Sequence, residues 1–253
     1  MDDFKKNIEK SRNTDEQLKF YDQLSNFIES PEPSTMKKVQ NFPVFATRQN
    51  ITTFIEKYEI YKLVKNIPGS IVECGVAAGS GLMTFAHLCS IFEPYHYTRK
   101  IIGFDTFEGF TSIANEDKSS SAKHMLEGGL NFGGYETLKE AISLYDKNRT
   151  LGHIPKVELV KGDLCKTFAE YLEQNPSLVI GLLYMDVDLY KPTKEVLKLA
   201  WERIPKGGVL VFDEINHKDY PGETIAAMEQ LGIGNLRMQR LDISAMLSYC
   251  IKE

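Results

Sequence analysis

The sequence predicts an α/β protein built on a seven-stranded, mostly parallel sheet with helices on both faces. From residue 70 onward, short β-rich apolar runs alternate with helical segments, a pattern typical of parallel strands joined by helical crossovers. Two further apolar runs after residue 235 are close enough in sequence to pair as an antiparallel hairpin. The length of 253 residues suits one large α/β domain with a well-packed core.

Residues 1–68 form an N-terminal helical segment in this prediction, and residues 69–253 form the main domain. Apolar side chains recur at helical spacing over residues 14–28 and again over residues 50–66, so we expect a helix in each. The segment either packs on the main domain or serves as a cap over the site or a contact between subunits.

The main domain is expected to alternate strands and helices in order. The five predicted parallel strands cover residues 71–76, 101–107, 157–161, 178–186 and 208–212. The predicted helices cover residues 80–92, 135–148, 164–174, 192–203 and 221–231, and the hairpin strands cover 236–242 and 246–251. The Gly/Ser-rich stretch 108–134 predicts a long loop beside a strand end, a common place for a lid.

Charge and composition narrow the function classes. The 30 basic and 35 acidic side chains give a formal net charge of −5, so neither nucleic acid nor an anionic membrane is an expected partner. The charged N-terminus and the lack of a long apolar run predict a cytoplasmic protein. The four cysteines are far apart in sequence and are expected to be reduced thiols. Small molecules are therefore the expected ligands.

In an open parallel sheet, ligands bind where the strands end. The first strand ends at Glu73 and enters a turn of pattern G-x-x-x-G-x-G from Gly75 to Gly81, where glycine lets the backbone approach a ligand closely. The pattern differs from the G-x-G-x-x-G of dinucleotide-binding folds, which disfavours NAD. The alternative is a tight strand-to-helix turn without a ligand.

Two more acidic residues stand at the next strand ends. Asp105 follows the second strand, where a carboxylate can accept hydrogen bonds from both hydroxyls of a ribose. Asp163 follows the third strand, where its carboxylate could reach an exocyclic amine. Either residue could instead cap a helix. Taken in order with Glu73, they predict a cleft for an adenosine.

Acidic residues also end the fourth and fifth strands. Asp186 and the pair Asp213 and Glu214 are expected to converge on neighbouring strand ends. Buried carboxylates repel one another unless a proton or a cation neutralises them, and an all-oxygen set suits Mg²⁺ or another hard divalent cation. The alternative is that these side chains cap helices or pair with lysines. His217, in the following loop, is either a base or a solvated side chain.

Two long motifs carry a resemblance to a known family. Met185-Asp186-Val187-Asp188-Leu189-Tyr190-Lys191-Pro192-Thr193 and Pro205-Lys206-Gly207-Gly208-Val209-Leu210-Val211-Phe212-Asp213-Glu214 resemble the macrocin/mycinamicin family of sugar O-methyltransferases. The resemblance covers about residues 45–231 and implies a Rossmann-like class I methyltransferase fold that uses S-adenosylmethionine and Mg²⁺. Where the family has two consecutive aspartates, this chain has Asp213 and Glu214.

The resemblance also implies roles for individual residues. The expected metal ligands are Asp186, Asp213 and Glu214. The expected cofactor-binding residues are Glu73, Gly75, Val76, Ala77, Ser80, Asp105, Thr106, Phe107, Gly162, Asp163 and Asp186. We expect Asp186, or else His217, to remove the proton from a sugar hydroxyl that the metal makes more acidic.

The acceptor is expected to be a small molecule with a hydroxyl group, most simply a sugar. Arg48, Tyr58, Tyr61 and the 108–134 loop are candidates for its walls. A rival function inside the same fold is methylation of a catechol or another small diol, because a metal that chelates adjacent oxygens serves both. A rival of another class is a non-catalytic nucleoside- or metabolite-binding module. Enzymes of the resembled family often assemble through N-terminal helices, which implies a homo-oligomer.

Overall fold

The computed structural model describes residues 14–118 and 124–253; residues 1–13 and residues 119–123 of the predicted loop lie outside the described part. The chain divides into two compact units, Met1–Thr53 and Phe54–Glu253. Residues 54–68, assigned to the N-terminal segment from the sequence, make their contacts within the second unit.

The first unit is helical where it is described. Helix α2 (Asp15–Glu29) confirms the helix predicted from apolar spacing. Two short helices, α3 (Thr35–Gln40) and α4 (Phe42–Phe45), were not predicted, because six and four residues are too few for a periodic pattern to show. The rings of Phe27 and Phe45 stack with centroids 5.2 Å apart and join α2 to α4.

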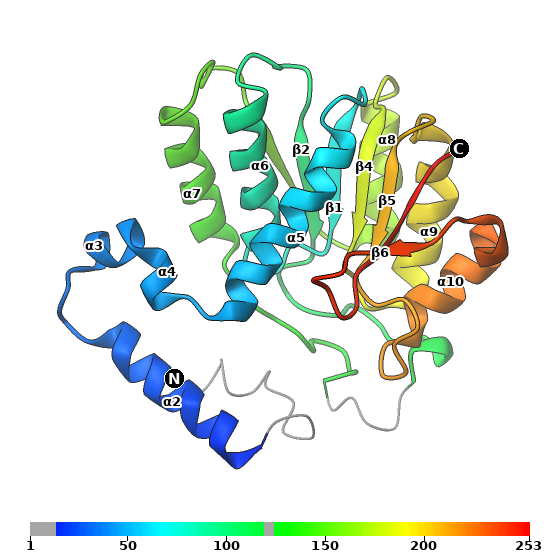
Figure 1. Cartoon of the computed structure of the whole chain (residues 1–253). Helices are drawn as coiled ribbons and strands as arrows, with labels where there is room; N and C mark the ends of the chain where they lie inside the picture. Colours follow the sequence, from blue (N-terminus) through cyan, green and yellow to red (C-terminus); the bar gives the residue numbers. More distant parts are fainter. Residues whose placement is uncertain (1–13, 119–123) are drawn as a thin grey trace. The chain divides into compact units, whose positions relative to one another are not determined.

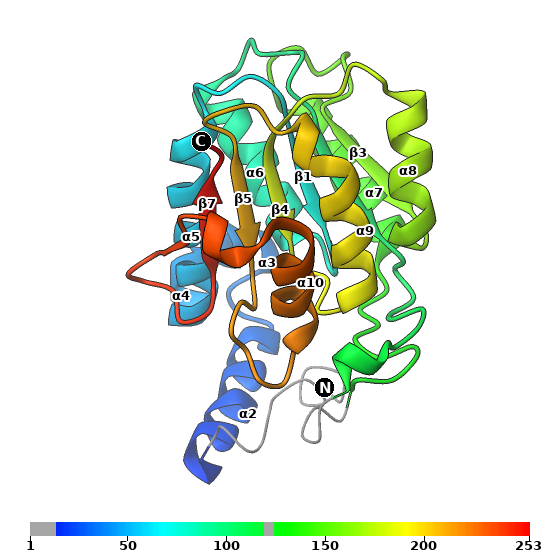
Figure 2. The same ribbon diagram turned by 90° about the vertical axis from the view of Figure 1, so that its right-hand side faces the viewer.

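The second unit contains the predicted seven-stranded sheet, in the order β3-β2-β1-β4-β5-β7-β6 (Figures 1 and 2). The neighbouring strands from β3 to β5 pair in parallel, and β7 pairs antiparallel with both β5 and β6. The pairing of β6 with β7 confirms the predicted hairpin. The strands are β1 (Ser70–Cys74), β2 (Ile101–Asp105), β3 (Val157–Lys161), β4 (Ile180–Met185), β5 (Val209–Phe212), β6 (Gln239–Arg240) and β7 (Ser248–Ile251).

Helices cover both faces of the sheet and explain why the central strands read as continuous apolar runs. One core cluster joins the sheet to α5 (Arg48–Val64) from Phe54 onward, α6 (Ser80–Phe92) and α7 (Tyr135–Lys147). The other joins the opposite face to α8 (Leu164–Gln174), α9 (Tyr190–Ala200) and α10 (Pro221–Leu231). Each predicted helix is present: α6, α8 and α10 have the predicted bounds, and the ends of the others differ by up to three residues.

The hairpin strands are shorter than predicted. Strand β6 has only two paired residues, because it lies at the edge of the sheet with β7 as its neighbour.

Over the described ranges, the helices are too short or too polar for any of them to cross a membrane.

Candidate active site

The carboxyl ends of neighbouring parallel strands form a row along one edge of the sheet. The hydrogen-bond ladder runs one residue beyond β4 and β5: Asp186 N donates to Cys74 O at 2.9 Å, and Asp213 N donates to Met185 O at 3.1 Å. Asp186 and Asp213 therefore follow adjacent strands, as the sequence predicts.

The glycine turn after β1 lies directly against the end of β4. Gly75 has φ +88°, and a Cβ added to it would lie 1.7 Å from the carbonyl oxygen of Asp186. Ala77, with φ +48°, and Gly79, with φ +91°, continue the turn into α6. Ser80 begins that helix and is exposed. The turn is tight because its backbone packs on a neighbouring strand end, where only glycine fits.

Asp105 joins the turns that follow β1 and β2. Its Oδ2 accepts hydrogen bonds from Val76 N at 2.7 Å and Ala77 N at 2.8 Å, and its Oδ1 accepts one from Phe107 N at 2.6 Å. It is therefore not a helix cap. An ionised carboxylate has about four acceptor positions, so one remains for a ligand hydroxyl. The Thr106 hydroxyl turns away to donate to Gly109 O at 2.7 Å.

Asp163 adopts the alternative that the sequence left open. It is the N-cap of α8, and its Oδ1 accepts a hydrogen bond from Cys165 N at 3.0 Å. The preceding Gly162 has φ +142° and donates its N–H to Asp105 O at 2.9 Å. This bond extends the row of strand ends to β3, and the place of Asp163 beside an adenine stays a prediction.

Glu73 is a buried acid at the end of β1, with a side chain that is 1% exposed. Burial raises its pKa to about 7, although the positive charge of Lys57 opposes the rise. Its Oε2 atom has no hydrogen-bond partner among the residues that the structure describes. A buried carboxylate oxygen without a partner is costly, so this atom is available to a ligand donor.

Carboxylates crowd together beyond β4 and β5. Burial, followed by the charge of Asp213, raises the pKa of Asp186 well above its usual range. Burial also raises the pKa values of Asp213 and Glu214. Because each charge disfavours the ionisation of its neighbours, this cluster is ready to take up protons or a cation.

Two further acids join this cluster without having been assigned a role from the sequence. Glu223, in the first turn of α10, is fully buried and accepts hydrogen bonds from Val187 N at 3.2 Å and Glu214 N at 3.3 Å. Burial raises its pKa to about 8. Asp188 has φ +60°, and burial raises its pKa to about 7. A glutamate in the first turn of a helix is ordinary, so no sequence signal marked Glu223.

The carboxylates beyond β4 and β5 are the donors available to a metal ion. Within residues 14–118 and 124–253, no three His, Cys, Asp or Glu side chains already lie as a ligand set for a metal ion. Yet the donors are all oxygen, and Oε2 of Glu214 is buried with no hydrogen-bond partner in the same ranges. The chemistry of these residues therefore fits a hard divalent cation, which neutralises crowded carboxylates.

The loop between β5 and α10 places His217 beside aromatic rings. The His217 ring lies 5.1 Å from the Tyr220 ring, measured between centroids, and its backbone N–H donates to Glu214 O at 3.2 Å. His124, which was assigned no role from the sequence, stacks on Tyr220 and is hydrogen-bonded to its hydroxyl. The 108–134 loop thus reaches the β5 end of the row.

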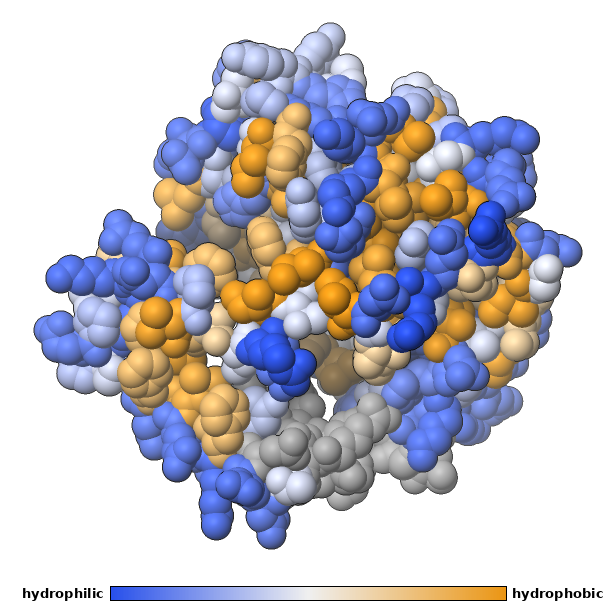
Figure 3. All heavy atoms as spheres, viewed as in Figure 1, coloured by the Kyte–Doolittle hydropathy of each residue, from blue (hydrophilic) through white to orange (hydrophobic). Residues whose placement is uncertain are grey.

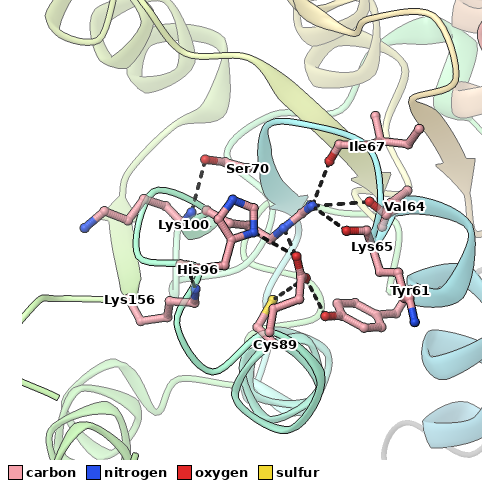
Figure 4. Close-up of polar contacts among 11 residues, drawn as sticks. Tyr61, Val64, Lys65, Ile67, Ser70, Cys89, His96, Lys100 and Lys156 are labelled. Carbon is pink, nitrogen blue, oxygen red and sulfur yellow. Dashed lines mark hydrogen bonds and ion pairs between the residues drawn. The ribbon is translucent and has the colours of Figure 1, made fainter. Parts of the chain in front are cut away.

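Tyr61 is not a wall of the acceptor site, so that prediction is wrong. Its side chain is fully buried, and its hydroxyl donates to Glu93 Oε2 at 2.5 Å. Glu93 follows α6 and also binds Arg99, which precedes β2, so this cluster lies at the opposite edge of the sheet. Figure 4 shows Tyr61, Cys89 and His96 pointing toward one another there. The Tyr61 ring therefore packs in the hydrophobic core and does not serve to bind a ligand.

Solved structures resemble this chain over nearly its whole length. The crystal structure of CalS11, a calicheamicin methyltransferase, is 34% identical with a TM-score of 0.89, and the match covers 94% of this chain and 93% of that chain. The apo structure of CalS11, described as a TDP-rhamnose 3'-O-methyltransferase, is 32% identical with a TM-score of 0.81, over 94% and 95% of the two chains. Fold and site together define the class of S-adenosylmethionine-dependent methyltransferases with the class I fold.

The family follows from a second comparison. The model of the family described as Macrocin-O-methyltransferase (TylF) matches residues 48–243, so the chain belongs to that family, whose members are S-adenosylmethionine-dependent O-methyltransferases. Mycinamicin III 3''-O-methyltransferase of Micromonospora griseorubida is 27% identical over 150 residues, which are 58% of this chain and 56% of that protein. The match thus spans about half the length of this curated relative.

Proposed function

We propose that this protein is a Mg²⁺-dependent O-methyltransferase that transfers the methyl group of S-adenosylmethionine to a sugar hydroxyl. The observation that carries the proposal is the row of strand ends, in which the glycine turn at Gly75 lies against the acidic end of β4. That contact brings a cofactor-binding turn and a cluster of carboxylates to the same edge of the sheet. The family and the CalS11 neighbours support a sugar as the acceptor.

In this proposal each part of the row has a separate task. Glu73 faces the methionine part of the cofactor, Asp105 its ribose and Asp163 its adenine. Asp186, Asp213 and Glu214 would hold the divalent cation, which would lower the pKa of the acceptor hydroxyl. Asp186 removes the hydroxyl proton, and His217 is the second candidate base. The surrounding protein holds the hydroxyl in line with the methyl group and excludes water.

Calorimetric titration tests the cofactor first. S-adenosylmethionine and its demethylated product are titrated into the purified protein with Mg²⁺ and then with a chelator. Binding in the micromolar range supports the proposal and leads to an assay of TDP-rhamnose and free glycosides for metal-dependent methylation. Binding that is independent of metal, with no methyl transfer to any acceptor, would favour a non-catalytic binding module. A catechol acceptor that outcompetes the sugars would favour the diol alternative.

We also propose that the first unit is a cap or a subunit contact. Figure 3 shows apolar side chains gathered on it. Among its described residues, the large apolar side chains that are at least 40% exposed are Phe20, Phe27, Ile28, Met36, Val39, Phe42 and Val44. Such a concentration is typical of a surface that binds another protein surface. Light scattering during size-exclusion chromatography tests the expected homo-oligomer, and a monomer at micromolar concentration would contradict it. The cytoplasmic location stays a prediction.

A further inference from the structure

Lys57, on α5, is a buried cation that the proposed chemistry does not use. Its side chain is only 5% exposed. Lysine is among the residues most rarely buried, because removing an ammonium group from water is costly unless negative charges compensate for it. A buried lysine beside a site rich in carboxylates therefore has an electrostatic reason to be there.

The ammonium group of Lys57 is held by Tyr184 of β4. Lys57 Nζ donates to the Tyr184 hydroxyl at 3.3 Å and lies 4.5 Å from the centroid of the Tyr184 ring. The Tyr184 side chain is 1% exposed, and hydrogen bonding to it opposes the rise in the pKa of Asp213 that burial causes. A chain of contacts thus runs from Lys57 through Tyr184 to the acidic end of β5.

The same lysine packs beside Glu73. A Cβ added to Gly81, in the first turn of α6, would lie 2.0 Å from Glu73 Oε1 and 2.6 Å from Lys57 Cε. Both side chains therefore pass through one small space that only glycine leaves open. The positive charge of Lys57 also stabilises the ionised forms of Glu73, Asp186 and Asp213.

We propose that Lys57 is a positioning residue of the methyl-transfer site: its ammonium group is the shared counter-charge that holds Glu73 against α6 and, through the Tyr184 hydroxyl, Asp213 at the end of β5. The inference rests on the proposed function, in which Glu73 lies on the cofactor side of the site and Asp213 on the cation side. One cation then supports both halves of the site without contacting a reactant.

Variants of one helix test this role. Lys57→Met removes the charge and keeps much of the side chain, Lys57→Arg keeps the charge, and Lys62→Met is the matched control. Lys62 is also on α5 and lies 5.1 Å from the centroid of the Tyr58 ring, but it is exposed and pairs with Glu59. Titration of S-adenosylhomocysteine is expected to show affinity weakened about tenfold or more by Lys57→Met. Lys57→Arg restores most of the affinity, and Lys62→Met leaves it unchanged.

A merely structural lysine would give a different result. It would lower the melting temperature in Lys57→Met while the S-adenosylhomocysteine affinity of the folded protein stayed at the wild-type value, and that result would overturn the proposal. Tyr184→Phe provides a milder test, because it removes the hydroxyl and keeps the ring under the ammonium group. It is expected to weaken divalent-cation affinity, measured with Mn²⁺, more than S-adenosylhomocysteine affinity.

A double-mutant cycle separates this inference from the proposed function. Thermal unfolding of the ligand-free wild type, Lys57→Met, Glu73→Gln and the double variant measures the coupling without any cofactor. The shift caused by Lys57→Met is expected to be smaller in the Glu73→Gln background, since the charge that the lysine compensates is gone. Equal shifts in both backgrounds would overturn the shared counter-charge. A wild type that binds no S-adenosylhomocysteine would instead overturn the proposed function, and with it the positioning role, whatever the cycle shows.

Discussion

The backbone N–H of Tyr190 donates a hydrogen bond to the buried carboxylate of Asp117, with 2.6 Å between the nitrogen and Oδ1. Oδ2 of the same carboxylate accepts the N–H of Ala114 at 3.0 Å, and Oδ1 lies 2.3 Å from the place of a Cβ added to Gly222. Asp117 thus fastens the loop after β2 to the first turns of α9 and α10. The long loop is therefore anchored where α9 and α10 begin, beyond the ends of β4 and β5.

Replacement of Asp117 by alanine is expected to destabilise the protein. The free energy of unfolding should fall by about 2 kcal/mol, because the variant leaves the partly buried Tyr190 N–H without its acceptor. Urea unfolding followed by circular dichroism measures the change. Asn115→Ala is the control, because Asn115 is exposed and lies with Asp117 in the short 3-10 helix Asn115–Asp117; it should stay within about 0.5 kcal/mol of the wild type. Equal losses in the two variants would show that the anchor is unimportant.

The glycine turn after β1 predicts how an added methyl group changes both stability and cofactor binding. Gly75→Ala forces a Cβ against the Asp186 carbonyl oxygen, whereas Gly133→Ala, also at positive φ, meets no atom of the described residues within 4 Å. Gly133→Ala should cost about 1–2 kcal/mol of unfolding free energy from its backbone conformation alone. Gly75→Ala should cost more and should also abolish S-adenosylhomocysteine binding in calorimetry. Retained binding by folded Gly75→Ala would mean that the cofactor lies elsewhere.

The acid cluster predicts a stabilising effect of Mg²⁺. At a Mg²⁺ concentration of 100 times Kd, binding to the folded state alone adds about 2.7 kcal/mol to the free energy of unfolding. A melting temperature that rises with Mg²⁺ in the wild type should become insensitive to Mg²⁺ in Asp186→Asn. Glu136→Gln, an exposed position on α7, should respond as the wild type does. An unchanged wild-type melting temperature with Mg²⁺, Mn²⁺ and Ca²⁺ would argue against a metal site.

Glu93, which is hydrogen-bonded to Tyr61 and His96 of Figure 4, predicts how stability depends on pH. Burial alone would raise its pKa, but the Tyr61 hydroxyl, His96 and Arg99 together lower the pKa below the usual 4.5. A lowered pKa in the folded state contributes stability that is fully present above the unfolded-state pKa and is lost as pH falls through the folded-state pKa. The wild type should therefore lose stability below pH 4.5.

Glu93→Gln isolates that contribution. At pH 7 it should lower the free energy of unfolding by about 2 kcal/mol, because buried Arg99 loses its carboxylate. The difference from the wild type should shrink as pH falls below 4.5 in a series of urea titrations. Glu59→Gln, which breaks the exposed pair with Lys62, should cost less than about 1 kcal/mol at every pH. A Glu93→Gln difference that is constant down to pH 3 would contradict this account.

The fold was largely predictable from the sequence because its strong signals are periodic. Strand β3 has the predicted bounds, and β4 covers Ile180–Met185 where the prediction was 178–186. Both were found because apolar runs between turn residues mark buried strands. Helices α3 and α4 were missed because they are shorter than two turns. Strand β6 has two residues where seven were predicted, because the length of an edge strand depends on its pairing partner, which the local sequence does not show.

The site was predictable where a residue follows a strand, and not where a helix brings a charge to it. Asp105 and Asp186 stand at strand ends, and the rule that ligands bind there was enough to select them. Lys57 and Glu223 enter from the middle of α5 and the start of α10, at positions that read as ordinary surface charges. Their burial follows from tertiary packing, which periodicity alone does not reveal.

The antiparallel insertion of β7 between β5 and β6 also has a consequence for synthesis on the ribosome. While the chain is being made, β5 can pair with β4 at once, but its other edge stays open until α10 and β7 have also emerged. An open edge beside the fully buried residues of β5 invites pairing with another nascent chain. Chaperone protection during translation should therefore matter most in the interval between the emergence of β5 and that of β7.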